Sequence, residues 1–275
     1  MTAQHAEGDD LATATGMVDR LSAPDFALDA DQIAYATAYL APGDLDAILV
    51  ARLRDPEAMA ARERKAADLR ARDWPALGRY RRENAALADR AVNVVFIGDS
   101  LTEMWGVAQP DLFTGGIVNR GISGQTSPQI LLRFMADVVT LKPRVVHLLC
   151  GTNDIASNTG PTTPQDYRNN VLAMLALAQA HGIQVVLGGL LPVIDLPWVP
   201  AVTNAGARIA ELNLWLAQTA QDRGLVFADY HPALAADTGA MRGDLTRDGV
   251  HPVIAGYQIM RPIAEAAVAA AWAKT

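Results

Sequence analysis

The pattern of apolar and polar positions changes near residue 90 of this chain. From Asn93 onward, short apolar runs alternate with longer segments in which apolar residues recur at helical spacing. The runs are unbroken rather than alternating, which is typical of strands that are buried on both faces of a parallel sheet. Five such strands are expected, at residues 94–97, 117–119, 145–150, 185–187 and 225–228. The pattern therefore predicts an α/β fold with one doubly wound, five-stranded parallel sheet and helices on both faces.

Helices are expected between these strands, with recognisable start and stop signals. Ser127-Pro128 places a capping residue before a proline, which favours a helix from Ser127 to about residue 139. Pro262 is expected to kink or split the last helix, because proline cannot donate the internal hydrogen bond. The other helices are expected to begin at 101 and to cover 163–182, 203–223 and 254–272.

Residues 1–90 contain no strand-like run and are predicted to form a helical extension to a catalytic domain at residues 91–275. Helices are expected at 29–40 and 43–53, followed by a charged helical face at 57–72. Trp74, Leu77 and Tyr80 recur at helical spacing and are expected to pack this segment onto the main domain. Two other roles stay open for the extension, a lid over the active-site crevice and a contact between subunits of a homo-oligomer.

Composition and charge exclude several classes of protein. The chain of 275 residues is 51% hydrophobic and 19% charged, which is ordinary for a globular protein, and its net charge of −7 makes a nucleic-acid partner unlikely on electrostatic grounds. Cys150 is the one cysteine, so no internal disulfide can form. No apolar run is long enough to span a bilayer, and the acidic first residues do not resemble a signal peptide. The sequence as written is expected to be cytoplasmic, or secreted or periplasmic if a signal peptide has been removed.

Polar residues suited to catalysis follow the predicted strands. Ser100 comes after the first strand, Gly121 after the second and Asn153 after the third, while Asp248 and His251 lie beyond the fifth. The carboxyl ends of parallel strands meet at one edge of a sheet, where open α/β folds bind their ligands. Each residue alone also fits a structural role as a helix cap or turn residue. Their joint placement at one edge favours a catalytic site.

These residue types suit acyl transfer. A serine hydroxyl such as that of Ser100 becomes a nucleophile when a base takes its proton, and a neutral histidine, with an ordinary pKa of roughly 6.5, is suited to that task. We expect His251 to be the base and Asp248 to orient its ring. The backbone N–H groups of Ser100 and Gly121 and the side-chain amide of Asn153 are expected to form an oxyanion hole.

Other kinds of site fit the sequence less well. His231, two residues after Asp229, is a weaker rival for the base. No metal is expected, because no two histidines share ligand spacing and the one cysteine has no partner. Gly115-Gly116 precedes a strand, which is the wrong order for a phosphate-binding loop.

The ordered motifs resemble those of the SGNH hydrolases, also called GDSL esterases and lipases. The resemblance spans roughly residues 93–257 and rests on four blocks, which are GDSL at 98–101, the glycine of NRGISG at 121, GTND at 151–154 and the D-x-x-H at 248–251. It implies a flavodoxin-like sheet with strand order 2-1-3-4-5 and ester hydrolysis without a cofactor.

The sequence therefore predicts a serine esterase that acts on small-molecule carboxylic esters, with short-chain acyl or aryl esters preferred, through an acyl-enzyme intermediate. The substrate pocket is expected to include Met104, Trp105, Ile194 and Trp198. The alternatives within hydrolases are a carbohydrate O-acetylesterase, a lysophospholipase or a thioesterase. An alternative from another class is a non-catalytic binding module that retains the fold.

Overall fold

A computed structural model describes residues 30–43, 47, 51 and 55–275 of the chain. Five parallel strands form one sheet in the order β2-β1-β3-β4-β5, as predicted. The strands are β1 (Val94–Gly98), β2 (Ile117–Gly121), β3 (Val145–Leu149), β4 (Gln184–Gly188) and β5 (Val226–Ala228). Within the described ranges, no helix is both long and apolar enough to cross a membrane.

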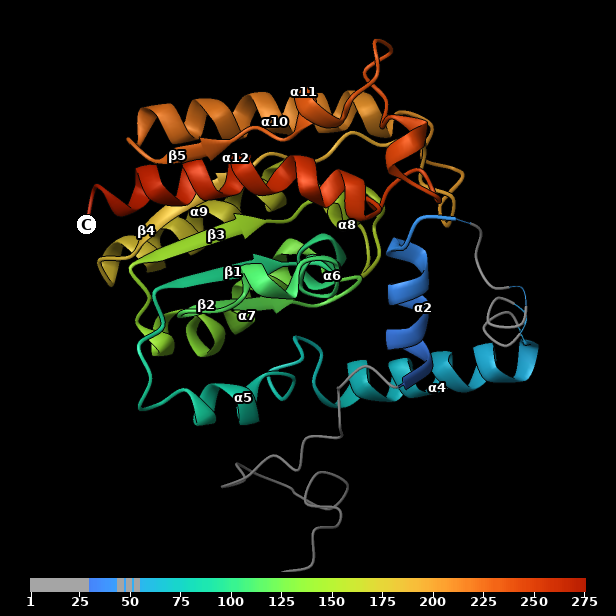
Figure 1. The fold of residues 1–275 in the computed structure, drawn as a ribbon, viewed down its shortest axis with the longest axis horizontal. Helices are drawn as coiled ribbons and strands as arrows, with labels where there is room; N and C mark the ends of the chain where they lie inside the picture. The colour runs from blue at the N-terminus through green and yellow to red at the C-terminus, as the bar shows by residue number, and fades with distance from the viewer. Residues whose placement is uncertain (1–29, 44–46, 48–50, 52–54) are drawn as a thin grey trace, which may run out of the picture.

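Helices lie on both faces of this sheet (Figure 1). The helices that follow the strands are α6 (Ser100–Ala108), α7 (Ser127–Asp137), α8 (Thr152–Ile155), α9 (Pro164–Ala180), α10 (Ala205–Asp222), α11 (His231–Leu234) and α12 (Ile254–Trp272). Short 3-10 turns lie at η1 (Pro110–Leu112), η2 (Val139–Leu141) and η3 (Gly243–Leu245). The helices before the sheet are α2 (Ala30–Leu40), α4 (Pro56–Arg72) and α5 (Arg81–Ala86).

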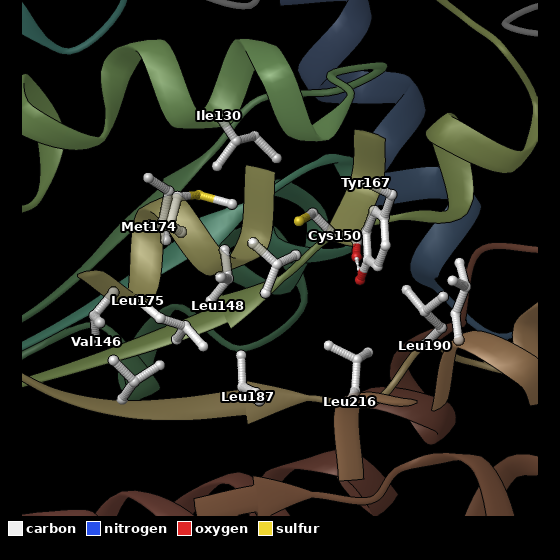
Figure 2. Close-up of a cluster of buried hydrophobic side chains, with 14 of the residues drawn as sticks. Ile130, Val146, Leu148, Cys150, Tyr167, Met174, Leu175, Leu187, Leu190 and Leu216 are labelled. Atoms are coloured by element: carbon white, nitrogen blue, oxygen red, sulfur yellow. Dashed lines mark hydrogen bonds between the residues drawn. The ribbon is translucent and has the colours of Figure 1, made fainter. Parts of the chain in front are cut away.

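Alternate strand residues point to opposite faces and build two separate cores. Val95 and Ile97 of β1 pack with α7, α9 and α10, and Figure 2 shows part of this core, where Met174 and Leu175 of α9 lie over Val146 and Leu148 of β3. On the other face, Phe96 of β1 packs with α6 and α12. Each fully buried large apolar side chain contributes about 1.5–3 kcal/mol to folding. Two cores of this kind hold the strand ends in fixed positions.

One predicted helix cap was wrong in detail, and one of the two effects expected of Pro262 does not occur. Thr126, not Ser127, caps α7, because the Thr126 side chain and that of Gln129 form a reciprocal capping box. Ser127 instead donates from its backbone N–H and its hydroxyl to the Asp154 carboxylate, at 2.9 and 2.5 Å. Pro262 does not split the last helix, since α12 runs through it without interruption.

The segment before the sheet agrees only in part with the prediction. Helix α2 was expected, and α4 is a solvated helix with no buried residue. Trp74, Leu77 and Tyr80 do not lie on a helix, because the Asp73 carboxylate accepts from two following backbone N–H groups and makes a turn. Of these three side chains only Tyr80 is buried. The predicted helix at 43–53 lies mostly outside the described residues.

Candidate active site

Three of the predicted catalytic residues meet at the carboxyl end of the sheet. Ser100 is the first residue of α6, directly after β1, and its Oγ lies 2.8 Å from Nε2 of His251. Nδ1 of His251 lies 2.7 Å from Oδ2 of Asp248. The structure therefore joins a hydroxyl, an imidazole and a carboxylate in one hydrogen-bonded chain, although 151 residues separate the first two. His231, the weaker rival, begins α11 instead.

The loop that carries Asp248 and His251 holds the Asp248 carboxylate in a fixed position. Oδ1 of Asp248 accepts from the backbone N–H groups of Val250 and His251, at 2.9 and 2.8 Å. Burial alone would raise the pKa of Asp248, but the hydrogen bond and charge of His251 outweigh it and hold that pKa well below its usual range. Asp248 is thus an ionised carboxylate aligned with the imidazole.

Another carboxylate lies directly beneath the serine. Asp99 is buried and caps α6 by accepting the Leu101 N–H at 3.0 Å. Burial raises the pKa of Asp99 to about 7, and the Leu101 hydrogen bond only partly offsets this effect. Asp99 therefore binds a proton more readily than an exposed aspartate does.

Asn153 reaches the site from α8, with its amide orientation set by neighbours. Its Oδ1 accepts from Nδ2 of Asn158 at 2.7 Å, so its own Nδ2 points toward Asp99 and Gln125. That Nδ2 donates to the Gln125 carbonyl at 3.0 Å and, over a longer 3.3 Å, to Oδ2 of Asp99. The bond to Asp99 is the longer and weaker of the two, so the Nδ2 hydrogen in that bond is the one that could be donated to a ligand instead.

Gly121 does not lie where the prediction placed it. Strand β2 continues two residues beyond its predicted end, and the N–H of Gly121 donates to Oδ1 of Asn119 at 2.8 Å. A Cβ at Gly121 would lie 2.2 Å from the backbone nitrogen of Glu103, so this glycine allows β2 and α6 to pack closely. Its N–H is already used, and Gly121 does not line the pocket.

Gly124, and not Gly121, lies at the pocket. It lines the pocket beside Ser100 and Asn153, with φ of +78°, a conformation that glycine adopts at little cost. No hydrogen bond of its N–H occurs within the part of the chain that the structure describes. The carboxylate of Glu103 holds this loop by accepting from the N–H and hydroxyl of Ser123, at 2.9 and 2.5 Å. The sequence carries one signal that distinguishes the two glycines. Gly124, the second glycine of NRGISG, follows the polar residue Ser123 rather than a residue of the strand.

The pocket next to the triad has a volume of about 440 Å³. Two of the four predicted substrate residues, Met104 and Trp198, line it. Trp105 does not, because it is fully buried between Phe96 and Tyr257 and its indole N–H donates to Gln109. The predicted pocket role of Trp105 was therefore wrong.

Ile194 also lies outside the pocket lining, with 53% of its surface exposed. Its backbone N–H donates to the Gly249 carbonyl at 2.8 Å, so it supports the His251 loop from outside. Trp198 reaches the pocket rim, where its indole N–H donates to Oδ1 of Asn158 at 2.9 Å. Trp198 is thereby linked through Asn158 to Asn153.

Two other predicted features can be placed. His147 is buried in β3, hydrogen-bonded to the Tyr230 hydroxyl at 2.7 Å, and burial lowers its pKa to about 3. Cys150 is buried as well, and burial raises the pKa of its thiol. Among the described residues, no cluster of histidine, cysteine and carboxylate side chains could hold a metal ion.

Known proteins resemble this chain over the same region. The sequence profile of the GDSL-like lipase/acylhydrolase family matches residues 96–259. A crystal structure of a GDSL-like lipase from Bacteroides thetaiotaomicron is 39% identical, with a TM-score of 0.68 over 72% of this chain and 98% of that one.

Two curated relatives match shorter parts of the chain. Esterase TesA of Pseudomonas aeruginosa is 31% identical over 50% of this chain, and the uncharacterized lipoprotein YqeF of Bacillus subtilis is 35% identical over 29% of it. The chain covers 62% of the length of the first and 34% of the length of the second.

Proposed function

Because the chain belongs to the GDSL-like lipase/acylhydrolase family, we propose that it is a serine esterase that acts on carboxylic esters through an acyl-enzyme intermediate. The observation that carries this proposal is the hydrogen-bonded series from Ser100 through His251 to Asp248. The name of the relative esterase TesA gives further support.

In the proposed first step, Oγ of Ser100 attacks the acyl carbon of the ester, and Nε2 of His251 takes the serine proton. Asp248 keeps Nδ1 of His251 protonated and stabilises the imidazolium that forms. The tetrahedral intermediate then expels the alcohol, which receives the proton from His251. Water attacks the acyl-enzyme with His251 as its base, and the carboxylic acid leaves while the serine regains its proton.

The negative charge on the intermediate needs hydrogen-bond donors in a fixed place. We assign this role to the backbone N–H groups of Ser100 and Gly124 and to Nδ2 of Asn153. Removal of one such donor from a serine hydrolase typically lowers turnover by about a hundredfold or more. The Gly124 assignment replaces the Gly121 that was expected from the sequence, because the Gly121 N–H is already bonded to Asn119.

Short-chain acyl or aryl esters are the proposed substrates. The pocket walls include the apolar side chains of Ala36, Met104 and Val107, and a volume of about 440 Å³ suits a small ester. A second candidate is an acetylated sugar, which is favoured by Trp198, a residue that is 44% exposed at the pocket rim and whose ring could stack on a sugar.

The experiment has two parts, labelling and a substrate panel. A fluorophosphonate probe should label the purified protein once per chain, and peptide mass spectrometry should place the label on Ser100. The Ser100→Ala variant should lose labelling and nearly all esterase activity. A matched control is Ser157→Gly, at an exposed serine with positive φ, which should keep both.

The panel compares p-nitrophenyl esters of increasing acyl length with acetylated xylose and acetylated glucosamine. Higher kcat/KM for short p-nitrophenyl esters supports the first candidate, and higher kcat/KM for the acetylated sugars supports the second. Labelling at a residue other than Ser100, or full activity in Ser100→Ala, would contradict the serine mechanism and would favour the non-catalytic module for this site.

A further inference from the structure

Helix α2 forms one wall of the substrate pocket. Gln32, Tyr35, Ala36 and Tyr39 line the pocket, and their spacing of three and four residues places them on one face of the helix. Ala36 and Tyr39 are buried there, whereas Ile33 is 47% exposed and does not line the pocket. Figure 1 shows α2 beside the end of the sheet where α6 and α8 lie. The helix thus faces the nucleophile although it precedes Ser100 by sixty residues in the sequence.

Arg247, the residue before Asp248, fastens α2 at its carboxyl end. Its guanidinium donates to the carbonyls of Tyr39 and Ala41, at 2.7 and 2.6 Å, and also to that of Gly43. The last carbonyls of a helix lack partners within the helix, and a cation placed there is favoured by the helix dipole. The last turn of α2 contains no basic residue of its own. The loop of the triad therefore supplies the cation that caps this helix.

The hydroxyl of Tyr39 makes a second connection to the same loop. It donates to the His251 carbonyl at 2.9 Å and accepts from the Arg247 N–H at 3.2 Å. Burial, together with the charge of Asp248, raises the pKa of Tyr39 above its ordinary value, so the hydroxyl remains a donor. The rings of Tyr39 and His251 also meet edge to face, with centroids 6.4 Å apart. The wall of the pocket and the base of the triad are thus parts of one hydrogen-bonded unit.

We propose that α2 sets the size of ester that the pocket accepts, with Tyr35 and Ala36 as its specificity-determining residues and Arg247 as the residue that holds the helix in place. This inference rests on the proposed esterase function. Across the pocket, α2 faces Met104 and Val107 of α6. The helix lies outside residues 96–259, the part of the chain that matches the family.

Two variants of the full chain test the proposal in opposite directions. Ala36→Leu adds volume to the wall, and Tyr35→Ala removes it. Two substrate series are used, p-nitrophenyl esters from acetate to dodecanoate, and acetate esters of alcohols from methanol to naphthol. Ile33→Ala, on the face of α2 away from the pocket, is the matched control and should reproduce the wild-type profile.

The expected result is a shift in the size profile of at least one series. In Ala36→Leu, kcat/KM for the large esters should fall by about tenfold or more relative to acetate, because one or two methylene groups in a filled pocket typically change discrimination by that factor. In Tyr35→Ala, the same ratio should rise severalfold. If one variant does not fold, as judged by circular dichroism, the other decides the question.

Three outcomes would contradict the role of α2 or the proposed esterase function. Activity in the wild type with unchanged profiles in the folded variants would overturn the role of α2 and leave the esterase function standing. A size profile that shifts as much in Ile33→Ala as in the two pocket variants would also overturn the role of α2 and leave the esterase function standing. A wild type that hydrolyses no ester in either series would overturn the proposed function, and the inference with it.

The role of Arg247 has a separate readout. Arg247→Met should raise hydrogen–deuterium exchange at the amides of α2 by about tenfold or more, while the amides of β1 and β3 remain protected. Arg247→Met should also raise kcat/KM for the large esters relative to acetate, as Tyr35→Ala does. Unchanged exchange in α2 would show that Arg247 does not hold the helix.

Discussion

Arg133 donates a hydrogen bond from Nε to the side-chain oxygen of Gln125 at 2.6 Å, and both side chains are buried. The same guanidinium donates to the Gly98 carbonyl at 2.9 Å and pairs with the buried Asp137 at 3.1 Å. The Gln125 carbonyl in turn accepts from Asn153. One buried cation therefore joins the strand end before the serine to the loop that carries Gly124, one of the proposed oxyanion donors.

The Arg133→Met variant is expected to lower the free energy of unfolding by about 3–5 kcal/mol, because it leaves the Asp137 carboxylate buried without its cation. Urea denaturation of wild type and variant measures this change. The double variant Arg133→Met/Asp137→Leu should recover part of the loss, since it removes the unpaired charge. A loss below about 1 kcal/mol in the single variant would contradict this account of the pair.

Asn153→Ala is expected to lower kcat on p-nitrophenyl acetate by about a hundredfold with little change in KM, because the lost donor acts on the transition state. Asn158→Ala is the comparison, since it leaves the Asn153 donor in place and removes the side chain that orients the Asn153 amide and binds the Trp198 indole; it should cause a smaller loss. Steady-state kinetics of both variants give the test. Equal kcat in Asn153→Ala and wild type would remove this residue from the mechanism.

The two glycines of the β2 loop are expected to respond differently to alanine. Gly121→Ala should reduce stability strongly, because the new methyl group would lie 2.2 Å from the Glu103 backbone nitrogen. Gly124→Ala has open space for its methyl group and only the strain of a positive φ, about 1–2 kcal/mol. Thermal unfolding compares their stability. A folded Gly121→Ala with wild-type Tm would contradict the packing role.

Protonation of Asp99 should make stability depend on pH in a defined window. Its pKa is about 7 in the folded protein, above the ordinary value of 3.8, so between these values the folded state holds a proton that the unfolded state has lost. The free energy of unfolding therefore falls as pH rises from about 4 to about 7.

Asp99→Asn removes this dependence, so its stability relative to wild type should rise by about 3 kcal/mol between pH 5 and pH 8. Urea denaturation at pH 5, 6, 7 and 8 measures the difference; Asp154, whose pKa burial also raises, is present in both proteins, and its charge contributes to the raised pKa of Asp99. A difference that does not change with pH would show that Asp99 titrates near its ordinary value.

Much of the fold follows from local features of the sequence. The apolar runs are long enough to predict all five strands, and the order of the sheet follows from the family resemblance. The Tyr167, Val171, Met174 and Ala178 face of α9 is buried as its helical spacing predicts. The meeting of Ser100, Asp248 and His251 was expected from the rule that the carboxyl ends of parallel strands share an edge, together with the family resemblance.

The details that the sequence did not reveal depend on long-range contacts. The end of β2 is set by pairing of Gly121 with Gly98, so a local reading ended the strand at Asn119 and placed Gly121 in the loop beyond it. Trp105 sits on the buried face of α6, whose orientation is fixed by packing against β1 and α12. The capping of α2 by Arg247 joins residues more than two hundred positions apart, and no local pattern marks such a contact.

The distance in sequence between Ser100 and His251 has a consequence during synthesis on the ribosome. With the proposed roles, a nascent chain that has emerged as far as β4 presents the nucleophile but neither its base nor the arginine that fastens α2. On the proposed mechanism, a translation product that stops before residue 247 carries the serine without its base, and we expect it not to hydrolyse esters.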